Sequence, residues 1–68
     1  MLSKFSERFK QIRKERGLSY ESLENVLGIS RSTMCRWENK QTDVKSEELI
    51  KVSQFFGVTV HYLLGLED

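Results

Sequence analysis

The residues best suited to chemistry in this sequence lie close together, between positions 30 and 36. Arg31 and Arg36 carry guanidinium groups, whose paired N–H donors fit guanine O6 and N7 or a phosphate. Ser30 and Ser32 carry hydroxyls that can donate or accept hydrogen bonds at base edges or at the sugar–phosphate backbone. If one helix presents these side chains together, the spacing predicts contacts with the base pairs of duplex DNA. An ordinary solvated helix face is the plain alternative.

Other kinds of site find little support in the sequence. Cys35 is the single cysteine and His61 the single histidine, which excludes an internal disulfide and a structural zinc site. There is no nucleophile paired with a base and no glycine-rich phosphate loop, so we expect no enzyme activity, no metal, no cofactor and no small-molecule ligand. A thiol sensor near arginines is an alternative role for Cys35, but a small side chain that fits the groove is the preferred explanation.

Length and composition are typical of one small domain. The 68 residues are 38% apolar and 31% charged, enough for a single core, which we expect within residues 5–65 of a domain covering residues 1–68. No apolar run approaches the roughly 18 residues that span a bilayer, and the start lacks a signal-peptide core, so we expect a cytoplasmic protein without a membrane partner. Residues 1–16 carry six basic and two acidic side chains, whereas residues 46–68 carry one basic and four acidic ones. We expect the acidic end to face away from DNA.

Apolar residues at helical spacing fill the stretches between glycines 17, 28, 57 and 65. Five helices are predicted, over residues 3–16, 20–27, 31–38, a segment ending at 56, and 60–64. Hydroxyl caps are predicted at Ser19, Ser30 and Thr59, each flanked by apolar residues that clamp a helix start. The fourth helix has two candidate caps, Asp43 and Ser46, and Met34 and Trp37 are assigned to the core.

The connection between the second and third predicted helices is only Gly28, Ile29 and the cap Ser30. A turn this short prevents antiparallel packing and sets two helices at a steep angle, as in a helix-turn-helix. The third helix then keeps its N-terminus and one flank in solvent, and it fits a major groove about 12 Å wide. The N-termini of both helices also offer backbone N–H groups to phosphates.

The order of these blocks resembles the lambda-repressor-like, Cro-type helix-turn-helix domain, also called the xenobiotic-response-element family of bacterial and phage regulators. The resemblance covers residues 9–65 and rests on Ile12–Ser19, Leu27–Thr33, Arg36–Asn39, Phe56–Val60 and Tyr62–Gly65. It implies an all-α, compact five-helix fold with the helix-turn-helix in helices 2 and 3. It also implies a sequence-specific, double-stranded DNA-binding transcriptional regulator, with repression expected. Prophage repressor, antitoxin and restriction-system controller stay open as types.

The resemblance assigns roles by position. Base reading falls on Arg31, Ser32 and Arg36, with Ser30 and Cys35 beside them. Phosphate contacts are expected at Tyr20, Asn39 and Lys40, and at Ser19 and Thr33 near the starts of the two helices. A structural ion pair is implied between Arg13 and Glu38. The other basic residues of the first helix either bind phosphate or only raise the local potential.

At positions 20 and 24 the sequence departs from the family pattern. Tyr20 stands where the family usually has glutamine, and its phenol can still hydrogen-bond to phosphate. Glu24 stands where the family usually has a small alanine between the two helices. Because an unpaired buried carboxylate is costly, we expect Glu24 to turn to solvent or to pair with Arg31 or Arg36, or else the angle between the helices opens slightly.

A single module of this size buries too little surface for tight specific binding, so we expect a two-fold dimer on a palindromic operator. Within these residues the dimer candidates are Val60, Tyr62 and Leu66 around the fifth helix, and a weak homodimer that forms mainly on DNA is the expected form. The alternative is a helix-turn-helix-fold protein-interaction module without DNA binding. The low net charge and the residues at positions 20 and 24 favour that alternative.

Overall fold

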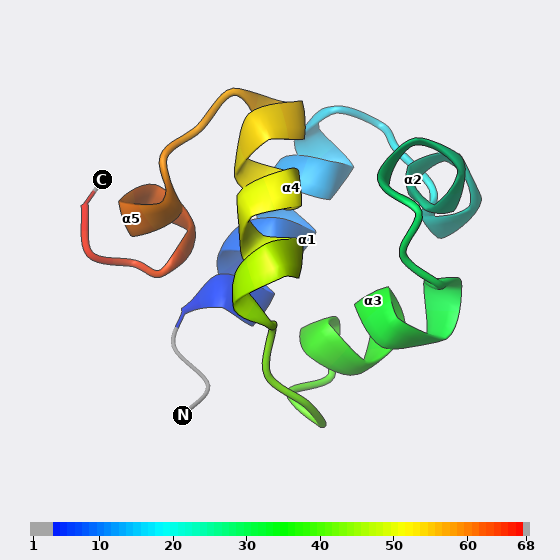
Figure 1. Ribbon diagram of the computed structural model, residues 1–68, viewed down its shortest axis with the longest axis horizontal. Helices are drawn as coiled ribbons and strands as arrows, with labels where there is room; N and C mark the ends of the chain where they lie inside the picture. The colour runs from blue at the N-terminus through cyan, green and yellow to red at the C-terminus, as the bar shows by residue number, and fades with distance from the viewer. Residues whose placement is uncertain (1–3, 68) are drawn as a thin grey trace.

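Five helices follow one another along residues 4–67, the part of the chain that the computed structural model describes, and no strand occurs there (Figure 1). They are α1 (Phe5–Glu15), α2 (Tyr20–Leu27), α3 (Arg31–Glu38), α4 (Ser46–Phe56) and α5 (Val60–Leu63). The all-α prediction is confirmed, and α2 and α3 have the predicted bounds. The expected start of the first helix at Ser3 lies outside the described residues. Arg16 and Leu64 are the C-caps of α1 and α5 rather than their last residues.

The three predicted hydroxyl caps are confirmed. Ser19 accepts from the backbone N–H of Ser22 at 3.1 Å and Ser30 from that of Thr33 at 3.3 Å. Thr59 caps α5 in the same way. Each cap residue has an extended backbone conformation. Its hydroxyl can therefore accept a hydrogen bond from an N–H that the first helical turn leaves without a partner.

The start of α4 differs from the prediction, since neither Asp43 nor Ser46 is its cap. Lys45 occupies the cap position, and the carboxylate of Glu48 accepts from its backbone N–H at 3.0 Å. Ser46 is already the first helical residue, and the Asp43 carboxylate accepts from the neighbouring backbone N–H of Val44 at 2.9 Å. The negative side chain at the third helical position also suits the positive end of the helix dipole.

The core brings all five helices together. Trp37, which is 1% exposed, packs edge-on against Phe5 and Phe9 of α1 at ring-centroid distances of 5.2 and 5.3 Å. The other buried apolar residues are Ile12, Leu23, Leu27, Ile29, Met34, Val52, Phe56 and Leu63. Met34 and Trp37 are therefore core residues, as predicted. Within the described residues no helix is long and apolar enough to cross a membrane.

Arg8 of α1 and Arg16, the C-cap of α1, contact α5 and α4. Arg16 donates to the backbone carbonyl of Phe56 at the end of α4 at 3.1 Å and lies over its ring. The guanidinium of Arg8 lies 4.5 Å from the ring centroid of Tyr62 in α5. These side chains have intramolecular partners, which the sequence did not reveal, and part of the positive charge of α1 therefore serves the fold.

Candidate nucleic-acid interface

The turn between α2 and α3 has the features that the sequence predicts for it. Gly28 adopts φ +70°, a left-handed conformation that glycine reaches without a side-chain clash. Ile29 is buried, whereas Ser30 and Arg31 are exposed. The buried side chain anchors the turn in the core, and α3 therefore begins at the surface.

One face of α3 packs on the core and the other is open to solvent. Met34 and Trp37 are 0% and 1% exposed. Arg31, Ser32 and Arg36 are all exposed, and Cys35 is half-buried beside them. The residues assigned to base reading thus share the outer side of one short helix.

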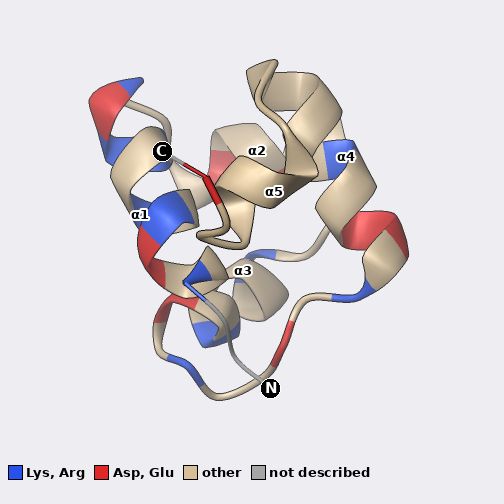
Figure 2. Ribbon diagram, turned by 90° about the vertical axis from the view of Figure 1, so that its left-hand side faces the viewer, with Lys and Arg blue, Asp and Glu red and all other residues tan. Residues whose placement is uncertain are grey.

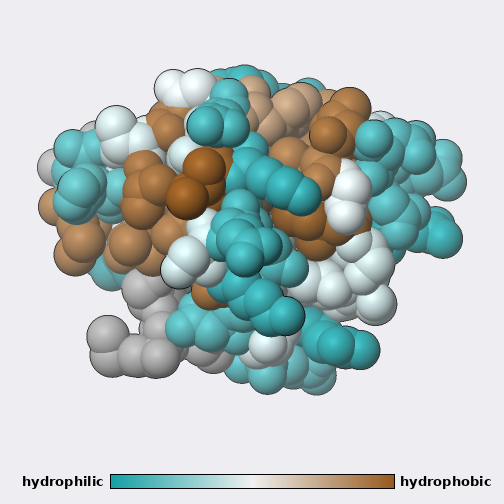
Figure 3. Space-filling view, in the orientation of Figure 1, coloured by the Kyte–Doolittle hydropathy of each residue, from teal (hydrophilic) through white to brown (hydrophobic). Residues whose placement is uncertain are grey.

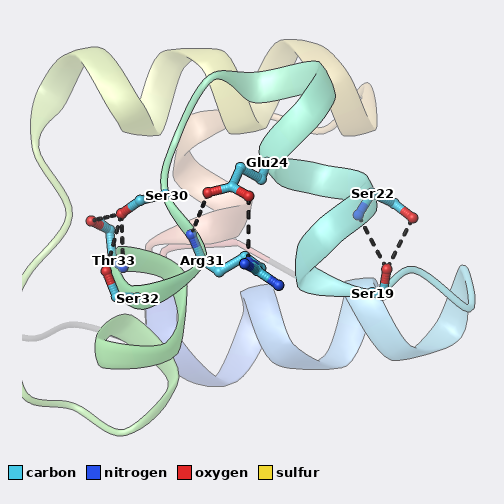
Figure 4. A network of polar contacts seen from close by, with 7 residues as sticks. All are labelled: Ser19, Ser22, Glu24, Ser30, Arg31, Ser32 and Thr33. Carbon is cyan, nitrogen blue, oxygen red and sulfur yellow. Dashed lines mark hydrogen bonds and ion pairs between the residues drawn. The ribbon is translucent and has the colours of Figure 1, made fainter.

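The hydroxyls at the start of α3 bond to one another (Figure 4). The Oγ of Ser30 lies 2.8 Å from Oγ1 of Thr33 and 3.2 Å from Oγ of Ser32. Because Ser30 also caps the helix, its oxygen is largely satisfied within the protein. Ser32 and Thr33 stand at the outer edge of this cluster and keep hydrogen-bonding capacity for another partner.

Glu24 reaches from α2 to the first residue of α3 (Figure 4). Its Oε2 accepts from the backbone N–H of Arg31 at 3.2 Å, and its Oε1 lies 3.4 Å from Nε of the same residue. The expectation that Glu24 pairs with one of the two arginines is confirmed for Arg31. The pair is open to water, since the side chains of Arg31 and Glu24 are 60% and 38% exposed.

Arg13 and Glu38 form a forked ion pair that joins α1 to the end of α3. Nε and Nη2 of Arg13 donate to the two carboxylate oxygens at 2.7 and 3.1 Å. The remaining Nη1 donates to the backbone carbonyl of Leu18 at 3.0 Å. The hydrogen bond to Glu38 raises the pKa of the Arg13 guanidinium above its ordinary value.

Tyr20 completes this cluster, a role that sequence reasoning missed. Its hydroxyl donates to Glu38 at 2.7 Å, and the Arg13 guanidinium lies 4.5 Å from its ring centroid. Burial, with the hydrogen bond to Glu38, raises the pKa of the hydroxyl to about 12. The group expected to contact phosphate therefore already has an internal acceptor. The sequence held one signal for this role, namely that Tyr20 replaces the usual glutamine of the family while the Arg13–Glu38 pair is kept.

Two further phosphate candidates lie after α3. The Asn39 amide donates to Sγ of Cys35 at 3.3 Å. Nζ of Lys40 lies 3.2 Å from a carboxylate oxygen of Glu7, with both side chains more than half exposed. Exposed pairs of this kind contribute little to stability.

A hollow of about 210 Å³ lies beside α3, between its outer flank and the start of α4. It is lined by Thr33, Arg36, Trp37, Thr42, Asp43, Lys45 and Glu48. Figure 2 shows basic residues recurring along α1, whereas Glu47 and Glu48 make the first turn of α4 acidic. Two basic side chains, Arg36 and Lys45, and two acidic ones, Asp43 and Glu48, line the hollow together.

The comparisons with known proteins agree with this geometry. The family described as "Helix-turn-helix domain" matches residues 6–68. The transcriptional regulator SinR of Bacillus licheniformis is 40% identical over 63 residues, which cover 91% of this chain and 57% of that protein. The transcriptional activator BcrR of Enterococcus faecalis is 34% identical over 64 residues, or 94% of this chain and 31% of that protein.

The fold also has a similar solved structure. The P22 c2 repressor protein, solved in complex with a synthetic operator, superposes with a TM-score of 0.84 at 25% identity and covers 93% of this chain and 96% of that one. The curated relatives are longer, and this chain spans 31% to 57% of their lengths.

Proposed function

This chain belongs to the helix-turn-helix domain family and has the lambda-repressor-like five-helix fold, and on that premise we propose that it binds duplex DNA through α3 and regulates transcription. The observation that carries the proposal is the division of α3. Met34 and Trp37 hold one face in the core, while Arg31, Ser32 and Arg36 are presented to solvent. A helix held in this way fits the major groove, where arginine pairs with guanine.

Base reading falls to Arg31, Arg36 and Ser32, with Cys35 beside them on the same helix. Ser30 supports them through its cap and its bond to Thr33. Phosphate contacts fall to Thr33, Asn39 and Lys40, and at the start of α2 to Ser19 and the backbone N–H of Tyr20, whose hydroxyl is bonded to Glu38. Backbone N–H groups at a helix start bind phosphate without any side chain.

Repression is the direction we propose. A domain that covers its operator blocks access to overlapping promoter DNA and needs no further surface for that effect. P22 c2 is named a repressor, whereas BcrR is named an activator. Whether a bound regulator represses or activates transcription depends on where its site lies relative to the promoter. Such a regulator acts in the cytoplasm, where bacterial DNA lies. A reporter gene with the operator placed within or upstream of the promoter tests the direction of regulation.

The binding test is a selection from random duplex DNA, followed by titration of the selected sequence at two salt concentrations. We expect a palindromic consensus whose affinity falls steeply with salt, because phosphate contacts release counterions. No enrichment by folded protein would contradict the proposal and favour a protein-interaction module, whose apolar contacts respond little to salt.

Substitutions then separate base reading from phosphate contact. Arg31→Ala or Arg36→Ala should each cost about 1–3 kcal/mol of operator binding and relax base preference. Lys40→Ala should weaken operator and unrelated DNA alike and reduce the salt dependence. Lys51→Ala, at an exposed position of α4, removes the same charge as a control. If both arginine variants kept wild-type preference, the assignment of α3 to the major groove would be wrong.

A further inference from the structure

We propose that Glu24 is a specificity-determining residue, which withholds Arg31 and the start of α3 from DNA phosphates so that Arg31 is available mainly to a base. This inference rests on the proposed DNA binding. It concerns the position between α2 and α3 where the family usually has alanine.

The geometry places a carboxylate where a phosphate oxygen would otherwise bind. The backbone N–H of Arg31 is among the first donors of α3, and such donors attract anions at a helix N-terminus. Glu24 accepts from that N–H at 3.2 Å, and its second oxygen lies 3.4 Å from Nε of Arg31. Glu24 thereby occupies both the backbone N–H and the Nε of Arg31, two donors that could otherwise bind a DNA phosphate whatever the base sequence.

The contact leaves the far end of the arginine available. Glu24 meets the Nε side of the guanidinium, and Nη1 and Nη2 make no hydrogen bond with the residues that the structure describes. These two nitrogens form the end-on fork that fits guanine O6 and N7. Glu24 therefore limits the directions in which Arg31 can point and repels phosphates that approach the same spot.

The exposure of the pair argues against stability as its main effect. Both side chains are more than a third exposed, and ion pairs in that setting contribute little to folding. The negative charge of Glu24 nevertheless repels the phosphates of any duplex that approaches α3. On the operator, a base acceptor for Arg31 offsets this repulsion, whereas on unrelated duplex nothing does. A repulsive element of this kind is a recognised source of specificity.

The test compares Glu24→Gln with the wild-type protein on the selected operator and on a scrambled duplex of equal length, each at two salt concentrations. We expect affinity for the scrambled duplex to rise about threefold to tenfold, with a smaller change for the operator, so that the ratio of the two falls. Glu21→Gln is the matched control, because it removes the same charge from an exposed position of α2. Thermal melting of both variants checks that they fold.

A second arm repeats Glu24→Gln in an Arg31→Ala background. The backbone N–H of residue 31 remains in this background, so the substitution should lower the affinity ratio by clearly less than it does when the Arg31 side chain is present. A Gln variant that behaves like Glu21→Gln, or that lowers the ratio equally without Arg31, overturns the inference while DNA binding stands. A wild-type protein that binds no duplex overturns the proposed function itself, which is a different result.

Discussion

The carboxylate of Glu38 shows how one residue can connect three helices. It receives two donors from Arg13 of α1 and one from Tyr20 of α2, and it stands at the end of α3. Its side chain is only 4% exposed, so a missing donor would leave a buried charge incompletely paired. The position of the base-reading helix relative to α1 and α2 therefore depends on this group.

Tyr20 gives this cluster a measurable pH dependence. The pKa of its hydroxyl is raised from 10.0 to about 12, first by burial and then by the bond to Glu38. A group with a raised pKa in the folded state contributes stability that is fully present below the unfolded value and is lost as pH rises toward the folded value. Between pH 9 and 11 the wild-type protein should lose on the order of 1 kcal/mol more than Tyr20→Phe. Urea unfolding at both pH values measures the difference, and parallel losses would contradict it.

At the scale of elements, α3 ends without the glycine that closes α2 and α4. Asn39 is its C-cap with φ −90°, and the left-handed residue is Lys40, with φ +58°. The backbone N–H of Gln41 donates to the carbonyl of Arg36 at 2.9 Å and closes the turn. A side chain at such a φ costs about 1–2 kcal/mol relative to glycine, so the end of the DNA-facing helix is strained.

Lys40→Gly should relieve this strain. We expect it to be more stable than Lys40→Ala by about 1 kcal/mol, because alanine keeps the Cβ at positive φ while both variants lose the exposed pair with Glu7. Chemical denaturation of the two variants measures the difference. Both remove the same charge, so both should weaken DNA binding similarly, and equal stability would show that the backbone at residue 40 is not strained.

Features that depend on neighbouring residues were predictable from the sequence, whereas features that depend on packing between distant helices were not. Ser19, Ser30 and Thr59 were predictable as caps because each hydroxyl meets an N–H three residues away. The bond of Tyr20 to Glu38 spans 18 positions and depends on the packing of α2 against α3, which no local pattern specifies. The positive φ of Lys40 was not predicted either, because no glycine marks the end of α3. Glu24 was partly predictable, because the cost of an unpaired carboxylate requires a nearby cation.

At the scale of the whole molecule, an apolar surface lies apart from the exposed face of α3. Figure 3 shows apolar side chains gathered over α5 and again between α4 and α2. Leu66 is 68% exposed just after α5, while Val60 and Tyr62 are half-buried, the latter beneath the guanidinium of Arg8. Of the dimer candidates, Leu66 therefore offers the most apolar area to a second copy.

Leu66→Glu should distinguish DNA binding by a single copy of the protein from DNA binding by two copies that contact each other. If two copies meet through this end of the molecule, the substitution leaves affinity for a single half-site unchanged but lowers affinity for the palindrome by about tenfold or more, because the second binding event loses its tether. Ile50→Glu, at an exposed apolar position of α4, introduces the same charge as a control and should bind the palindrome more tightly than Leu66→Glu. Sedimentation of the wild-type protein with palindromic duplex should give two copies per duplex. One copy per duplex at saturating protein would contradict the two-fold arrangement, and its base contacts would then have to supply the whole of the specificity.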